Sequence, residues 1–132
     1  MMLGWVADVE KASLENDNFR TALYTGAHTQ LTVMSLAAGE DIGLEAHDHL
    51  DQFLRVEQGQ GRVELGRSET GVDETYEVGP DWAIIVPAGV WHNLVNTGDE
   101  ELKLYSLYSP PEHPDGTVHK TKAEAEAAEH DH

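Results

Sequence analysis

The sequence predicts an all-β fold, a sandwich or barrel of short antiparallel strands. Runs rich in apolar and β-branched residues recur along the chain, and Gly, Pro, Asn or Asp interrupts them about every 8 to 12 residues. No long helical pattern separates these runs, and no repeat of about 20 to 50 residues is visible. At 132 residues, the chain can bury one hydrophobic core. We therefore expect a single β domain.

Alternating or continuous apolar runs mark the individual strands. Val63 and Leu65 alternate with Arg62 and Glu64, which is typical of a strand with one buried face. The run 82–86 is almost wholly apolar and indicates an inner strand. The expected strands are 19–25, 30–37, 42–49, 52–57, 62–65, 74–78, 82–86, 91–96 and 102–108.

The chain divides into three parts around these strands. Residues 1–28 lead into the barrel, 29–108 form its core, and 109–132 form a C-terminal loop and an acidic tail. Three prolines and an Asp-Gly pair in 109–122 predict an ordered excursion, from which His113 or His119 could close over the barrel mouth; a plain surface loop is the alternative. Residues 121–132 are rich in Ala and Glu, so they form either a short helix or a disordered tail.

Composition narrows the function. The formal net charge is -17, from 25 acidic and 8 basic residues, which argues against a nucleic-acid partner. The absence of cysteine removes disulfides and thiolate metal sites, leaving His, Asp, Glu and Gln as the strong metal ligands. The N-terminus has no basic start followed by an apolar run, and no apolar span of about 20 residues occurs. We expect a cytoplasmic protein that does not bind membranes.

A His-x-His pair stands out in the expected strand 42–49. Alternate side chains of a strand share one face, so Glu45, His47 and His49 would point together. Two imidazoles aimed at one volume favour a metal site, while a solvated polar strand is the alternative. The choice depends on further ligands, and a Pro-x-Gly turn places His92 at the start of another strand.

Together these segments resemble the two sequence motifs of the cupin superfamily. The first reads Gly43-x3-His47-x-His49-x2-Gln52-x6-Gly59, and the second Pro87-x-Gly89-x2-His92-x3-Asn96. The resemblance covers residues 29–108 and implies a conical jelly-roll β-barrel that holds one divalent metal ion. Carried over position by position, it implies the ligands His47, His49, Gln52 and His92. The ion would be manganese, iron, zinc, nickel, cobalt or copper.

The sequence departs from the family pattern at Gln52, where an acidic residue is usual, and at Asp81, where a Gly is expected and a turn would change. Three imidazoles and an amide would leave the charge of the ion uncompensated, which favours an anionic substrate or a metal-bound hydroxide. Some sugar- and uronate-processing cupins are similar in having Gln in this slot.

Glu45 would share a face with the paired histidines, and there it could serve as a catalytic general acid or base; a rim carboxylate or a group that orients a ligand is the alternative. The segment 109–122 and the Asp-Gln-Phe around Gln52 resemble small bacterial mannose-6-phosphate isomerase-like cupins. That resemblance implies isomerisation or ring opening of a small sugar-like or carboxylated substrate. The alternatives are a metal-dependent dioxygenase and a non-catalytic ligand-binding protein. We also expect a homodimer.

Overall fold

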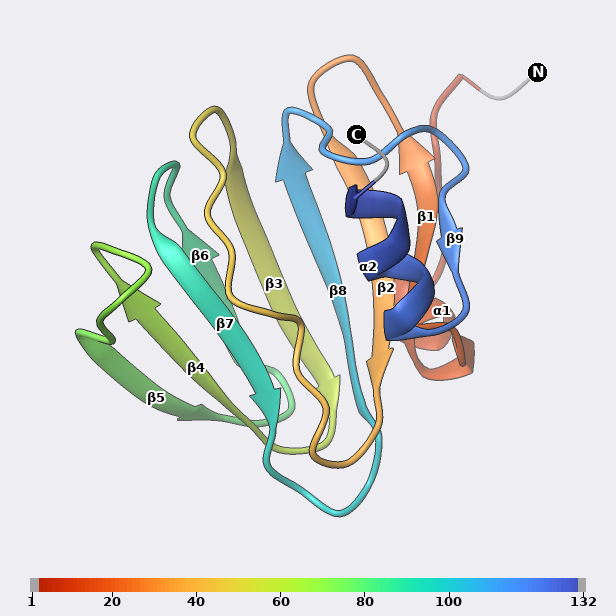
Figure 1. The fold of residues 1–132 in the computed structure, drawn as a ribbon. Coiled ribbons are helices and arrows are strands. Elements are labelled where there is room, and N and C mark those ends of the chain that lie inside the picture. The colour runs from red at the N-terminus through yellow and green to blue at the C-terminus, as the bar shows by residue number, and fades with distance from the viewer. Residues whose placement is uncertain (1–2, 131–132) are drawn as a thin grey trace.

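Two antiparallel β-sheets make up the fold (Figure 1), and the computed structural model describes residues 3–130. One sheet has six strands in the order β6-β3-β8-β2-β1-β9, and the other has three in the order β5-β4-β7. The strands are β1 (Arg20–Thr25), β2 (Gln30–Leu36), β3 (Asp51–Gln58), β4 (Gly61–Gly66), β5 (Glu74–Val78), β6 (Ala83–Val86), β7 (Trp91–Asn96), β8 (Leu102–Ser109) and β9 (Val118–His119). The helices are α1 (Val9–Glu15) and α2 (Lys122–His130). The predicted all-β class is confirmed.

The core lies between the sheets. Along β3, buried Gln52, Leu54 and Val56 alternate with more exposed residues, so one face of this strand points into the core. Every residue of β2 is buried. Helix α1 contacts β2, β3 and β8 and so adds cover to the larger sheet. None of the described helices is long and apolar enough to cross a bilayer.

Helix α1 was not among the expected elements, although it carries a clear start signal. Asp8 caps it by accepting a hydrogen bond from the Lys11 backbone N–H at 3.1 Å. At the other end, the buried Lys103 ammonium donates to the carbonyls of Leu14 (2.8 Å) and Asn16 (2.9 Å). Lys103 therefore satisfies carbonyl groups that the end of the helix leaves free.

The strand expected over 42–49 is wrong; the other expected strands are present, with ends that differ by at most one residue. The run 82–86, expected as an inner strand, is instead the edge strand β6, in which Ile85 is 67% exposed. Within 42–49 only Glu45 forms a bridge, to His92. Gly43 adopts a φ of 104°, which no strand contains, and its N–H donates to the Asn93 side chain at 3.0 Å. A turn at 48–49 then ends the extended path. The segment consequently runs beside β7 and forms backbone hydrogen bonds with it only at separate positions, from Ile42 to Leu94 and between Glu45 and His92.

The C-terminal segment is fastened to the barrel by Gln30. The Gln30 side-chain oxygen accepts from the backbone N–H groups of Glu112 (3.2 Å) and His113 (2.9 Å), and its amide donates to the His113 carbonyl at 2.8 Å. Of the two alternatives for the tail, the structure has a helix, α2; residues 131–132 lie outside the described part. Lys122 at the start of α2 forms an ion pair with Asp41.

Candidate metal centre

A paired backbone bridge brings Glu45 and His92 together. The Glu45 N–H donates to the His92 carbonyl at 3.1 Å, and the His92 N–H donates to the Glu45 carbonyl at 2.9 Å. Residues paired this way present their side chains on the same face. The turn before β7 adds a third tie, because the Gly89 N–H donates to the His47 carbonyl at 2.8 Å. Backbone hydrogen bonds thus hold both segments of the site.

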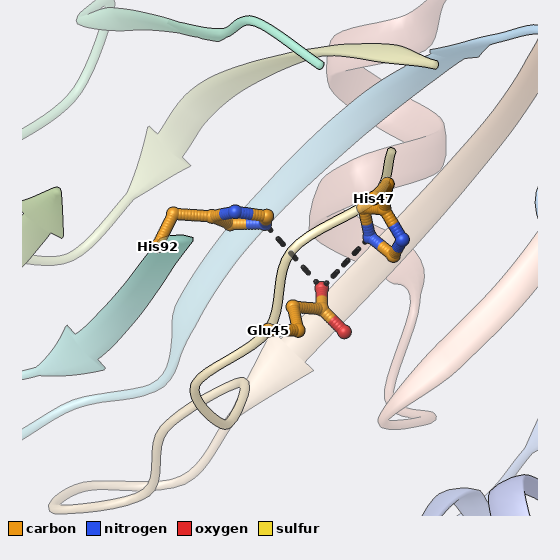
Figure 2. A group of neighbouring side chains, drawn as sticks. All are labelled: Glu45, His47 and His92. Carbon is orange, nitrogen blue, oxygen red and sulfur yellow. Dashed lines mark ion pairs between the residues drawn. The ribbon is translucent and has the colours of Figure 1, made fainter. Parts of the chain in front are cut away.

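Three side chains converge at this bridge, as Figure 2 shows. The Glu45 Oε1 atom lies 3.4 Å from His47 Nε2 and 3.5 Å from His92 Nε2. One potential ligand atom from each residue falls within 4.8 Å of the others. The side chain of His92 is 3% exposed, that of His47 11% and that of Glu45 22%. The group is therefore shielded but open to the barrel mouth through Glu45.

The hydrogen bond that His92 makes through Nδ1 determines which of its two ring nitrogens carries the hydrogen. His92 Nδ1 lies 3.1 Å from the Val90 carbonyl oxygen, and a carbonyl only accepts, so Nδ1 carries the hydrogen. In neutral His92, the Nε2 lone pair then faces the Glu45 carboxylate. Two acceptors this close repel unless a proton or a cation lies between them. Neither His92 Nε2 nor His47 Nε2 has a hydrogen-bond partner among the described residues, so both fit a metal ion.

The same geometry keeps Glu45 ionised. Burial by itself would raise the pKa of the Glu45 carboxyl, but His47 and His92 beside it outweigh burial and lower the pKa to about 2. For His47, burial disfavours the charged ring, yet the Glu45 carboxylate raises the pKa above its ordinary value. The Glu45 carboxylate is therefore ionised at neutral pH, and either a protonated His47 or a bound metal ion can balance its charge.

Gln52 has a buried side-chain oxygen that is a candidate for a further ligand atom. Gln52 is 2% exposed; its amide N–H donates to Ser106 Oγ at 3.5 Å, while its Oε1 has no partner among the described residues. Gln52 is the register partner of Tyr108, so the two side chains share a face of the sheet. The Tyr108 ring lies edge-on to His47, 6.2 Å between centroids. A buried, unpaired amide oxygen is suited to bind a cation.

His49 is not brought into this group. The turn at 48–49 directs its side chain outward, where it is 67% exposed and its Nε2 lies 3.9 Å from Glu112 Oε2. Glu112 also approaches His47, with Oε2 3.6 Å from His47 Nδ1. Sequence reasoning singled out Glu45 as a proton-transfer group and did not identify Glu112 at all. In the run Glu45-x-His47-x-His49, either Glu45 and His47 or His47 and His49 could form the inward pair. Only the turn at 48–49 shows that the first pair faces inward.

A metal at this site would be held by one carboxylate and two imidazoles, and the Gln52 amide oxygen is a further candidate ligand. Such a set carries one negative charge, whereas the set expected from sequence was neutral. Carboxylate and imidazole ligands suit zinc, iron and other first-row divalent ions. The metal identity is open.

The sequence and the fold place the chain in a known family. The family model described as "Cupin domain" matches residues 32–108, so the chain belongs to the cupin family. It is 57% identical over 125 residues to the uncharacterized protein YrkC of Bacillus subtilis (strain 168), covering 95% of this chain and 67% of that one. It is 36% identical over 115 residues to the uncharacterized protein L612 of Acanthamoeba polyphaga mimivirus, covering 86% and 70%.

Solved structures agree with this assignment. The crystal structure of BH2720 from Bacillus halodurans has a TM-score of 0.92 and 55% identity, and the match covers 93% of both chains. KdgF from Halomonas sp. has a TM-score of 0.63 and 22% identity over 70% of this chain and 80% of that one, which shows a shared fold alone. The predicted cupin fold is confirmed. The mannose-6-phosphate isomerase-like subgroup receives no support from these relatives.

Proposed function

We propose that this protein is a metal-dependent enzyme acting on a small carboxylated or sugar-like substrate, and that Glu45, His47, His92 and Gln52 hold the ion. One observation carries the proposal: His92 Nε2 lies 3.5 Å from Glu45 Oε1 in a shielded position where no described donor separates them, so a neutral His92 would direct a lone pair at the carboxylate. A cation resolves that repulsion. A purely structural role does not explain a buried carboxylate between two imidazoles.

A bound divalent ion would supply Lewis-acid chemistry by polarising a carbonyl or hydroxyl oxygen of the substrate. Glu45 as a ligand would offset part of the charge of the ion, so it would not act as the general acid or base. Glu112 and His49 are better placed for proton transfer, because both lie at the mouth and their side chains remain 28% and 67% exposed. In an isomerisation, the Glu112 carboxylate would take a proton from a carbon next to the polarised carbonyl and return it to the neighbouring position.

A second candidate function is the use of dioxygen. Two histidines and one carboxylate with open positions form the ligand set of non-haem iron(II) oxygenases. The Glu45, His47 and His92 group has this composition. An iron-loaded protein that consumes oxygen only in the presence of an organic substrate would support this candidate over isomerisation.

Elemental analysis is the first test, on protein purified without added metal and again after loading. We expect about one divalent ion per chain after loading, and a content well below one would overturn the proposed site. The loaded protein is then assayed with aldoses, ketoses and uronates under nitrogen and under air. Conversion under nitrogen supports the isomerase proposal, and oxygen uptake supports the second candidate. A metal-loaded protein that binds such compounds but converts none would instead be a non-catalytic binding protein.

A further inference from the structure

A second histidine cluster lies beside α2, and the Tyr108 ring neighbours both this cluster and the metal centre. A cavity of about 200 Å³ lies there, and residues of α2 form part of its wall. Helix α2 packs beside β9 (Figure 1). The polar residues that line it are Arg20, His113, Thr117, His119 and Glu129. None of these residues belongs to the proposed metal ligands.

Arg20 carries a buried charge with no carboxylate of residues 3–130 within ion-pair distance. The residue is 3% exposed, and no Asp or Glu in residues 3–130 forms an ion pair with it. Its guanidinium lies 5.4 Å from the Phe19 ring centroid, and its Nε atom has no hydrogen-bond partner within the described chain. Arginine stays protonated in proteins, and an unpaired buried charge is costly. An anion in the cavity would remove that cost.

The two histidines beside Arg20 are set up as neutral groups. Arg20 Nη1 lies 3.2 Å from His119 Nδ1, and a guanidinium only donates, so Nδ1 accepts and the ring hydrogen lies on Nε2. His113 Nε2 is buried without a partner among the described residues. Burial first, and the Arg20 charge second, lower the pKa of His113 to about 3 and also lower the pKa of His119. At neutral pH, Arg20 is therefore the one cationic group lining the cavity.

We propose that this cavity is a binding site for the carboxylate group of a small molecule, with the Arg20 guanidinium as its charged donor. The planar fork of a guanidinium matches the two oxygens of a carboxylate. One positive charge balances a carboxylate, whereas a phosphate dianion would leave excess negative charge next to Glu129, which also lines the cavity. The volume holds roughly six water-sized groups, which suits a short acid.

The site is distinct from the metal centre. The Tyr108 ring is 1% exposed and neighbours both groups, with its centroid 6.2 Å from that of His47 and 5.2 Å from that of His113, and none of the residues lining the cavity belongs to the metal group. Carboxylate binding to the cavity therefore does not require the metal, and it can be measured on protein treated with a chelator.

The test is a titration of the full-length, chelator-treated protein with sodium acetate at pH 7, against sodium chloride of matched ionic strength. Ring signals of His113 and His119 are followed by NMR, and the Tm is recorded in parallel. We expect saturable shifts of both rings and a Tm that rises with acetate occupancy. Arg20→Gln should weaken acetate binding at least tenfold. Arg20→Lys should weaken it less, because Lys keeps the positive charge but lacks the planar pair of guanidinium N–H donors. Arg62→Gln is the matched control, because Arg62 lies on β4 of the other sheet and pairs with Glu64.

Equal acetate affinity in the wild type, Arg20→Gln and Arg20→Lys would overturn the proposal, as would shifts that never saturate. Tighter binding of inorganic phosphate than of acetate would overturn the carboxylate assignment. If Arg20→Gln does not fold, as judged by its NMR spectrum, the comparison rests on Arg20→Lys. Since no metal is present, these outcomes are independent of whether the metal site is correct.

Discussion

The two histidine clusters that neighbour Tyr108 place imidazoles beside charged groups of opposite sign. His47 and His92 face the Glu45 carboxylate, whereas His113 and His119 lie beside the Arg20 guanidinium. At the first cluster, the carboxylate outweighs burial and raises the pKa of His47. At the second, burial and Arg20 together lower the pKa of His113 to about 3. The charged partner thus contributes to pKa shifts of opposite direction at the two clusters.

Both clusters are built by the same structural device, a cross-strand pair of directly opposite residues. Glu45 bridges His92 at the start of β7, and Arg20 is the register partner of His119 between β1 and β9. Opposite residues in antiparallel pairs place their side chains side by side. Each pair therefore joins one charged group to one imidazole, and a further histidine completes the cluster.

The largest effect that separates the two clusters is expected from His92→Ala. Loss of a group that merely orients a metal ligand lowers metal affinity about 10- to 100-fold, so loss of a ligand should lower it at least about 100-fold. Competition with a chromophoric chelator measures this affinity. Acetate binding at the Arg20 cavity should stay at the wild-type level. Wild-type metal affinity in His92→Ala would remove His92 from the site.

Metal removal should destabilise the wild-type protein but not His92→Ala. A ligand present at about 100 times its Kd stabilises the folded state by about 2.7 kcal/mol, and a chelator removes that contribution. Calorimetry with and without chelator measures the difference. A chelator effect of equal size in both proteins would place the metal elsewhere.

A smaller effect is expected from Glu112→Gln, because Glu112 lies 3.6 Å from His47 Nδ1 and would orient the ring without touching the ion. Metal affinity should fall about tenfold. The backbone N–H of residue 112 still donates to Gln30, so the fold should persist. Glu77→Gln, an exposed change on β5, is the control and should leave affinity unchanged. A loss as large as that in His92→Ala would make Glu112 a direct ligand.

An effect of similar size is expected in the pH dependence of stability at the Arg20 cluster. In the unfolded chain, His113 takes up a proton near pH 6.5, whereas in the folded protein it does so only near pH 3. Because the pKa of His113 is lower in the folded state, the contribution of neutral His113 to folding stability is present above pH 6.5 and is lost as the pH falls towards 3. Urea unfolding of wild type and His113→Gln should show the wild type losing about 1 to 2 kcal/mol more between pH 6.5 and 5. His28→Gln, in an exposed turn, should follow the wild type; identical pH profiles for all three would contradict this account.

The sequence predicted the strands well because apolar alternation and turn residues are local signals. It failed over 42–49, where alternation continues but Gly43 and the turn at 48–49 break the extended path. Side-chain parity therefore identified Glu45 and His47 as neighbours and wrongly extended the face beyond the turn.

Contacts between residues far apart in the sequence could not be predicted, for a different reason. Glu112 approaches His47 because Gln30 holds the backbone of 112–113 from 82 residues away. Arg20 meets His119, 99 residues later, through β9, a strand of only two residues. No local pattern predicts either contact, since each depends on how distant segments pack.

The most direct test of the central claim is the metal content of Glu45→Gln and His49→Ala, loaded and dialysed alongside the wild type. The two variants change neighbouring residues of the same segment, one inside the converging group and the other 67% exposed. The account predicts about one equivalent in the wild type and in His49→Ala, and well under a tenth of that in Glu45→Gln. Retention of metal by Glu45→Gln together with its loss from His49→Ala would contradict it.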